Sequence, residues 1–255
     1  MTLRRTVLAC GAALALGGAT VAGCGADTEP QAPTAEATPA PAPAPADTTP
    51  SAQAPAAPKL KGPLAFHVRH RTQLRTKPGG RVVATLGTRT EFKSPRILAV
   101  AGRKPGWVMV RTSVRKHHVG WLPVKAGALF SQPRTLVIDL SERQLTVFHR
   151  GKATDTYKVA IGTAATPTPR GKFAVTDRLT VKPGTPYGCC ILALTAHQPK
   201  IAQGWGGGDR VAIHATPDTS VIGKRVSHGC VRASNKALHR LMRQVRLGTP
   251  VTIHA

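Results

Sequence analysis

A cysteine and a histidine in this chain have the types and spacing of a thiol nucleophile and its base. Cys230 lies in the segment 227–232 (SHGCVR), and His214 precedes it by sixteen residues. A cysteine attacks carbonyl groups as its thiolate, and a neighbouring histidine, whose ordinary pKa is near 6.5, commonly generates that thiolate. These residues predict acyl transfer through a thioester on Cys230, with His214 as the general base.

The residues around this pair fit such chemistry. Gly229 has no side chain and lets the backbone approach a substrate closely. The backbone N–H groups of Gly229 and Cys230 could therefore stabilise an oxyanion. None of the six acids after residue 131 stands out as a partner for His214. We therefore expect a backbone carbonyl to orient this histidine.

Two other interpretations of Cys230 remain open from the residues alone. His228 and Cys230 could be metal ligands, although His-x-Cys without a Cys-x-x-Cys or a paired histidine is a poor zinc pattern. Cys230 could also form a disulfide with Cys189 or Cys190.

The N-terminus predicts export. Arg4 and Arg5 precede an apolar stretch over 7–22, as in a bacterial signal peptide. The segment 21–24 (VAGC) resembles a lipobox, which predicts cleavage before Cys24, lipidation of its side chain and a lipid-anchored protein outside the cell membrane. The alternative is an ordinary secretory signal with a chance cysteine.

Residues 25–60 contain nine of the 22 prolines and are rich in Ala and Thr, which predicts a disordered linker of polyproline II character. Fully extended, it would reach roughly 110 Å. The formal net charge is +25. Nucleic acid is the usual partner of such a charge, but the export signal favours anionic wall polymers or lipid instead. We therefore expect no nucleic-acid partner.

Residues 61–127 predict short strands over 82–86, 97–101 and 107–110, closed by 120–123. The run LRTKPGG and the two Gly-Trp pairs resemble a bacterial SH3-like domain, a small β-barrel that often binds peptidoglycan beside wall enzymes. The alternative is a structural spacer. We expect Trp107 and Trp121 to pack in the core of this unit.

Residues 133–254 predict a second folded unit. A hairpin is expected over 135–140 and 144–148, and further strands over 156–161, 172–175 and 210–214, the last of which carries His214. One helix is predicted from apolar residues at helical spacing, with Ser234 as N-cap and Gly248 as its stop. Those apolar residues are Leu238, Leu241, Met242 and Val245.

The segments 213–216 (IHAT) and 227–232 (SHGCVR) together resemble the catalytic domain of the L,D-transpeptidase family, also called YkuD-like. The runs LVIDLSERQLTVF and TPTPRGKFAV are similar to that family as well. The resemblance implies a mainly β fold class: an SH3-like barrel followed by an L,D-transpeptidase-type β-sandwich with one helix towards the C-terminus.

The resemblance also implies roles by position. Cys230 would be the nucleophile, His214 the base, and the Ala215 carbonyl the group that orients His214. The oxyanion hole and substrate groove would be shaped by Ser227, His228, Gly229 and Arg232. Tyr187 and Trp205 would line the groove, although packing roles are equally consistent with their types.

Three positions depart from the pattern of the family. Ala215 stands where Gly or Ser is common, and Arg232 where some members have Asn. The segment 186–190 (PYGCC) matches only loosely. Cys189 and Cys190 could form a vicinal disulfide, act as a redox switch or remain thiols, and we expect quiet thiols.

The implied substrate is the tetrapeptide stem of peptidoglycan. Attack on the carbonyl of its third residue would release D-alanine, and an amine of a second stem would complete a 3→3 cross-link. Water as acceptor would give L,D-carboxypeptidase activity instead. The implied reaction requires neither a metal nor an organic cofactor, and carbapenems would acylate the cysteine. A non-catalytic wall-binding lipoprotein is the non-enzymatic alternative. An NlpC/P60 peptidase would have its cysteine before its histidine, and the Thr-Leu-x-Thr-Cys strand of sortases is absent.

Overall fold

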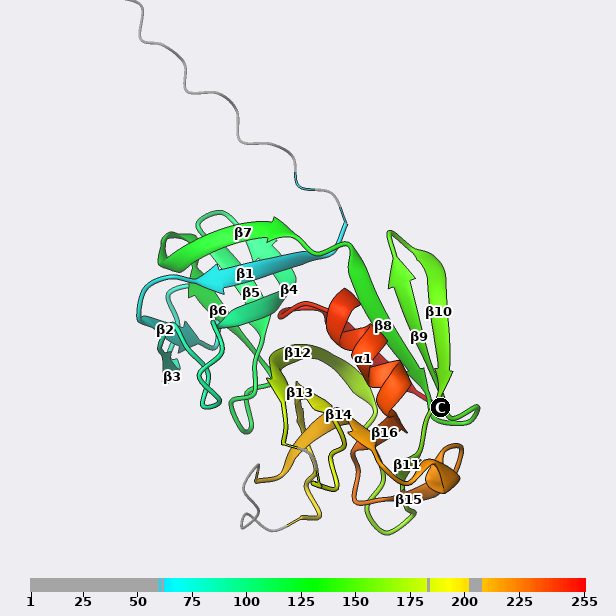
Figure 1. Ribbon diagram of the computed structural model, residues 1–255. Coiled ribbons are helices and arrows are strands. Elements are labelled where there is room, and N and C mark those ends of the chain that lie inside the picture. The colour runs from blue at the N-terminus through cyan, green and yellow to red at the C-terminus, as the bar shows by residue number, and fades with distance from the viewer. Residues whose placement is uncertain (1–59, 61, 183, 202–207) are drawn as a thin grey trace, which may run out of the picture. The chain divides into compact units, whose positions relative to one another are not determined.

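The computed structural model describes residues 60, 62–182, 184–201 and 208–255. The predicted signal peptide, Cys24, the linker and Trp205 lie outside this part of the chain. The described residues form two large β-sheets in succession, one two-stranded sheet and a single α-helix (Figure 1), which confirms the mainly β fold class. No helix within the described ranges is long and apolar enough to cross a membrane.

The N-terminal sheet is antiparallel and has the strand order β3-β2-β6-β5-β4-β1-β7. Its strands are β1 Leu64–Val68, β2 Thr72–Arg75, β3 Val82–Leu86, β4 Ile97–Lys104, β5 Trp107–Arg111, β6 Val119–Pro123 and β7 Gly127–Ser131. A short 3-10 helix, η1 Val124–Ala126, joins the last two. The strands predicted over 82–86, 97–101 and 107–110 are therefore present, and the sheet extends beyond residue 127.

The core of this sheet excludes both of its tryptophans. Along β2, β5 and β6, buried side chains alternate with more exposed ones, as the two-residue period of a strand requires. On β5 and β6 the buried positions include Val108, Val110 and Leu122. Trp107 and Trp121 occupy the alternate positions and are only half-buried. The expectation that they pack in the core was wrong. It rested on the size of the tryptophan side chain and did not consider which face of the strand each residue occupies.

The C-terminal sheet has eight strands in the order β10-β9-β8-β17-β12-β13-β14-β16 and is mixed. Its strands are β8 Arg134–Asp139, β9 Gln144–His149, β10 Lys152–Lys158, β12 Gly171–Thr180, β13 Cys190–His197, β14 Arg210–Thr216, β16 Val231–Ser234 and β17 Pro250–His254. Two short strands, β11 Ile161–Gly162 and β15 Arg225–Ser227, pair separately, and a 3-10 helix, η2 Thr219–Val221, lies between β14 and β15. The predicted hairpin is β8 and β9. The strand expected over 156–161 is divided between β10 and β11.

The helix α1 Asn235–Gln244 begins where its cap predicts. Ser234 Oγ accepts a hydrogen bond from the Ala237 N–H at 3.2 Å, which satisfies one of the free donors of the first turn. Leu238 and Leu241 are fully buried in the core of the C-terminal sheet. The helix ends at Gln244, earlier than the expected stop. Gly248 instead marks a close approach, because a Cβ there would lie 2.8 Å from Ile97 Cγ2 of the N-terminal sheet.

Polar contacts join the two sheets. Arg210, the first residue of β14, forms an ion pair with Glu91, and Thr90 donates to the buried Asp177 of β12. Arg115 Nη1 lies 2.7 Å from Asp209 Oδ2, beside the start of β14. The strand that carries His214 is therefore anchored at its first residue by the N-terminal sheet.

Removal of the helix cap should lower stability without changing the fold. We expect Ser234→Ala to reduce the free energy of unfolding by about 1 kcal/mol, because the Ala237 N–H loses its acceptor. Urea denaturation followed by circular dichroism would measure this loss. Ser234→Asp should retain most of the stability, and Thr88→Ala, at an exposed position, serves as a surface control. Equal stability of Ser234→Ala and the unmodified protein would contradict the capping role.

Candidate active site

The parallel pairing of β14 with β16 brings the cysteine and histidine regions together. In this register Ile213 lies opposite Val231, and His214 lies opposite Arg232. Paired residues in neighbouring strands project to the same face, and alternate residues along a strand share a face. Cys230, two residues before Arg232, is thereby placed on the His214 face. The charge of Arg232 acts on both groups and lowers the pKa of each.

His214 is held in one orientation by the backbone. Its side chain is buried, with 3% of its surface exposed, and Nδ1 lies 2.7 Å from the Ala215 carbonyl oxygen. A neutral imidazole bonded to a carbonyl must donate from that nitrogen, so Nδ1 carries the proton and Nε2 has the free lone pair. Burial lowers the pKa of His214 to about 4, against the opposing effect of the Ala215 hydrogen bond.

Cys230 is a free thiol immediately before β16. Burial raises its pKa, and the backbone of Ala212 and the charge of Arg232 oppose that rise. With a raised thiol pKa and a lowered imidazole pKa, both groups are neutral near pH 7. The arrangement suits proton transfer from the thiol to Nε2 during attack rather than a preformed thiolate–imidazolium pair.

Ser227 and Gly229 shape the turn that precedes Cys230. Ser227 Oγ donates to the Cys230 carbonyl at 2.5 Å and accepts from the Gly229 N–H at 3.0 Å. Gly229 has φ +116°, and a Cβ there would lie 2.6 Å from Gln198 Nε2. Both the conformation and the lack of space require glycine. His228, on the same turn, is exposed.

Gln198 is a residue of this site that sequence reasoning missed. It is buried at the end of β13, and its Nε2 donates to the Pro167 carbonyl at 2.6 Å. It thereby fixes the loop before β12 beside Gly229. A lone glutamine after a strand carries no motif, so only the fold reveals its position.

Tyr187 lies against His214. The two ring centroids are 5.0 Å apart with a nearly perpendicular, edge-to-face geometry. The next residue, Gly188, has φ +59°, and a Cβ there would lie 2.6 Å from both Ala215 Cβ and Asn235 Oδ1. The segment 186–190 is therefore packed tightly against the strand that holds the histidine.

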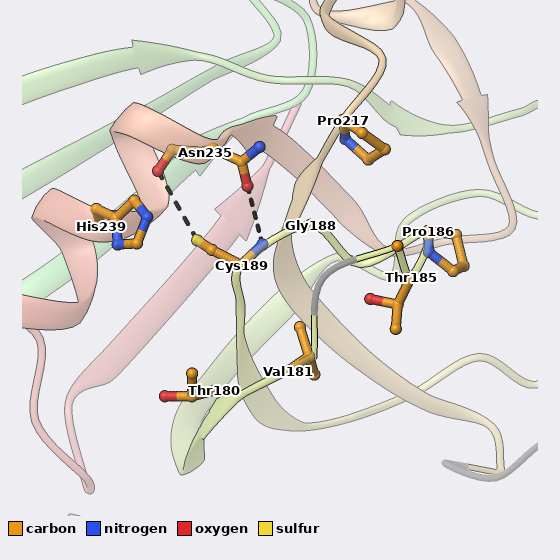
Figure 2. Close-up of a pocket in the computed structure, with 10 residues that line it drawn as sticks. Thr180, Val181, Thr185, Pro186, Gly188, Cys189, Pro217, Asn235 and His239 are labelled. Carbon is orange, nitrogen blue, oxygen red and sulfur yellow. Dashed lines mark hydrogen bonds between the residues drawn. The ribbon is translucent and has the colours of Figure 1, made fainter.

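Cys189 and Cys190 form a vicinal disulfide, which corrects our expectation of quiet thiols. Figure 2 shows Cys189 beside the first turn of α1, where its N–H donates to Asn235 Oδ1 at 2.8 Å. His239, one turn further along α1, is close enough for its ring and the two sulfurs to lie within 4.8 Å of one another. Sulfurs joined in a disulfide are not thiolate ligands, so this cluster fits no metal.

A pocket of about 900 Å³ adjoins this segment (Figure 2). Thr185, Gly188 and Cys189 line one side, and Asn235 and His239 of α1 line another. His214 and Cys230 are not among its lining residues, so the pocket is not formed by these two side chains. Asn235 both lines the pocket and accepts a hydrogen bond from the Cys189 N–H. Its position as the first residue of the helix did not indicate this contact in the sequence.

Comparison with known proteins identifies the C-terminal part of the chain. Residues 133–253 match the family model of the L,D-transpeptidase catalytic domain, YkuD. The chain is 36% identical over 121 residues to a protein of Bacillus licheniformis, and 33% identical over 125 residues to one of Bacillus subtilis strain 168, each provisionally assigned as L,D-transpeptidase YkuD. These alignments span 48% and 49% of this chain, and 66% and 68% of the relatives.

Solved structures of similar proteins were also found. An L,D-transpeptidase from Mycobacterium smegmatis has a TM-score of 0.42 at 18% identity, over 61% of this chain and 80% of that one. L,D-transpeptidase 3 from Mycobacterium tuberculosis, determined with a faropenem-derived adduct, has a TM-score of 0.41 at 17% identity, over 54% and 73% of the respective chains.

The lowered pKa of His214 predicts a loss of stability in acid. Above pH 6.5 the imidazole is neutral in both states and contributes no pH dependence. Below pH 6.5 the imidazole of His214 is protonated in the unfolded chain, whereas in the folded protein it stays neutral down to about pH 4. The penalty grows to about 3 kcal/mol over that window. Urea denaturation at several pH values would give the free energy of unfolding as a function of pH. Below pH 6.5 this free energy should fall less steeply for His214→Gln than for the unmodified protein. Equal slopes would contradict the burial of a neutral imidazole.

The vicinal disulfide predicts a specific mass. In a non-reducing peptide map, the peptide that contains Cys189 and Cys190 should be lighter than its dithiol form by two hydrogen atoms and should resist alkylation. The peptide that contains Cys230 should be alkylated in the same digest after unfolding. Alkylation of all three cysteines without prior reduction would rule out the disulfide.

Proposed function

The chain belongs to the YkuD family of L,D-transpeptidases, and from this membership we propose that it is a peptidoglycan L,D-transpeptidase that forms 3→3 cross-links. The observation that carries the proposal is the placement of Cys230 on the face of His214, whose Nδ1 is bonded to the Ala215 carbonyl. The pairing supplies a nucleophile and a base whose free lone pair is on Nε2. The proposed donor substrate is a tetrapeptide stem.

In the first half-reaction, Cys230 Sγ attacks the carbonyl carbon of the third stem residue while His214 Nε2 takes the thiol proton. The tetrahedral intermediate collapses, the bond to the terminal D-alanine breaks, and the imidazolium returns the proton to the leaving amine. A thioester remains on Cys230. Because the imidazole starts neutral and buried, it accepts this proton only while the attack proceeds.

In the second half-reaction, a side-chain amine of another stem attacks the thioester. His214 Nε2 takes the amine proton and returns it to the departing sulfur, which restores the thiol. A new amide bond then joins the two stems. Water as the acceptor would give the L,D-carboxypeptidase reaction from the same intermediate.

Ser227, Gly229 and Arg232 support these steps in different ways. Because the Gly229 N–H donates to Ser227 Oγ, we assign the oxyanion to the amide of Cys230 rather than to that of Gly229. Ser227 fixes the turn through its bond to the Cys230 carbonyl. Arg232 supplies a positive charge on the same face, which suits an anionic intermediate or a stem carboxylate. His228 and Tyr187 border the groove.

The location follows from the wall substrate. We propose that the enzyme acts outside the cytoplasm, anchored by a lipid on Cys24 and extended from the membrane by the linker over 25–60. The N-terminal sheet would correspond to the SH3-like domain proposed over 61–127. Its antiparallel strands and separate core support that assignment.

Carbapenem acylation tests the nucleophile directly. A carbapenem has a strained amide carbonyl, so imipenem should add once to the protein in intact-mass spectrometry. The adduct should be absent from Cys230→Ala and slowed at least tenfold in His214→Gln, because the base is lost. His254→Gln, which makes the same change at an exposed position at the end of β17, is the matched control and should be acylated at the unmodified rate.

Product analysis separates the reactions. Incubation with purified tetrapeptide dimers or monomers should give 3→3 cross-linked stems with free D-alanine. Tripeptides alone would support trimming instead. A folded protein with a reduced Cys230 and no adduct would contradict the enzymatic proposal and favour the non-catalytic wall-binding alternative.

A further inference from the structure

The outer face of β2, β6 and β5 carries two tryptophans and several cations that the proposed reaction does not use. Along β5 and β6, Trp107 and Trp121 project away from the core residues Val108 and Leu122. Arg75 of β2 lies directly opposite Trp121 of the neighbouring strand β6. Aromatic and cationic side chains therefore lie side by side on one surface of the N-terminal sheet.

A groove of about 620 Å³ is hollowed in this region. Its lining includes Trp107 and three cations, Arg71, Arg75 and Lys125, and no acidic residue. The Arg75 guanidinium is fixed by hydrogen bonds to the Gly80 carbonyl, at 2.8 Å, and to the Gln73 side chain. A guanidinium has five N–H groups, so others remain for a ligand. A cation that is already oriented costs less entropy to use in binding.

The charge around the groove is one-sided. Residues 61–131 contain 15 Lys and Arg and a single acid, Glu91, which is paired with Arg210 of the C-terminal sheet. Lys104 Nζ lies 5.6 Å from the centre of the Trp121 ring. Such a surface attracts a partner that is negatively charged throughout. A stem peptide that carries both carboxylates and an amine matches it poorly.

We propose that this groove, lined by Arg71, Arg75, Lys125 and Trp107, binds a phosphodiester-linked sugar or polyol polymer of the cell wall. The phosphates pair with the guanidinium and ammonium groups. The sugar or polyol carbons pack on the accessible part of the half-buried Trp107 ring. The choice of a wall polymer over nucleic acid rests on the proposed extracytoplasmic function, but the binding itself requires no step of catalysis.

The test uses the full chain with Cys230→Ala, so that binding is measured without turnover. Poly(glycerol phosphate) is titrated by fluorescence of the tryptophans and by isothermal calorimetry. Arg71→Gln combined with Lys125→Gln should raise Kd roughly tenfold or more, because two charge-assisted contacts are lost. Lys152→Gln combined with Lys236→Gln removes the same charge from exposed positions of β10 and α1 and should leave Kd unchanged.

Trp107 is tested separately. Trp107→Ala should weaken binding, and Trp107→Phe should recover most of it, while melting temperatures report whether each variant is folded. Affinity should fall as salt rises, because the contacts are ionic.

Three results would overturn the proposal: no binding of poly(glycerol phosphate) by the folded protein, tighter binding of polygalacturonate or DNA, or equal losses in the two double variants. Because Cys230→Ala is used throughout, failure here leaves the acylation result intact, and failed acylation leaves this binding measurable.

Discussion

The pairing of one parallel strand with another positions the chemistry of this molecule. β14 carries His214 and β16 begins just after Cys230, so a shift of one residue in their register would turn the two side chains to opposite faces. Fully buried side chains on both strands, including Ile213 and Val231, resist such a shift. The short hydrogen bonds of Ser227 then fix the turn before Cys230. The geometry of the nucleophile thus depends on sheet packing more than on any contact between the catalytic groups.

Burial has a double effect on this site. It keeps His214 neutral, as the proposed general base requires, while the hydrogen bond to the Ala215 carbonyl selects one tautomer. Burial also raises the pKa of the Cys230 thiol. The cysteine is therefore not activated at rest. A thiol with a raised pKa is mostly protonated near pH 7, and the protonated form is the less reactive one.

The sequence predicted those elements whose formation depends on residues close together in the chain. The helical spacing of Leu238 and Leu241, the Ser234 cap and the β8–β9 hairpin are encoded in neighbouring residues, and the structure contains them. Non-local features were missed or misjudged. The state of Cys189 and Cys190 depends on packing beside α1, the phase of Trp107 depends on which face of the sheet is covered, and Gln198 matters only because distant loops meet there. The sequence motif indicated His214 and Cys230, but the residues that surround them could be identified only from the fold.

The contacts between the two sheets have a consequence for how such a protein can change. Gly248 leaves no room for a side chain beside Ile97, and Arg210 and Asp177 each have a side-chain partner in the N-terminal part, Glu91 and Thr90. An exchange of the N-terminal sheet for an unrelated module would leave Asp177 and Arg210 of the C-terminal sheet without those partners. The two halves are therefore expected to be inherited together, and substitutions along their shared boundary to occur in compensating pairs.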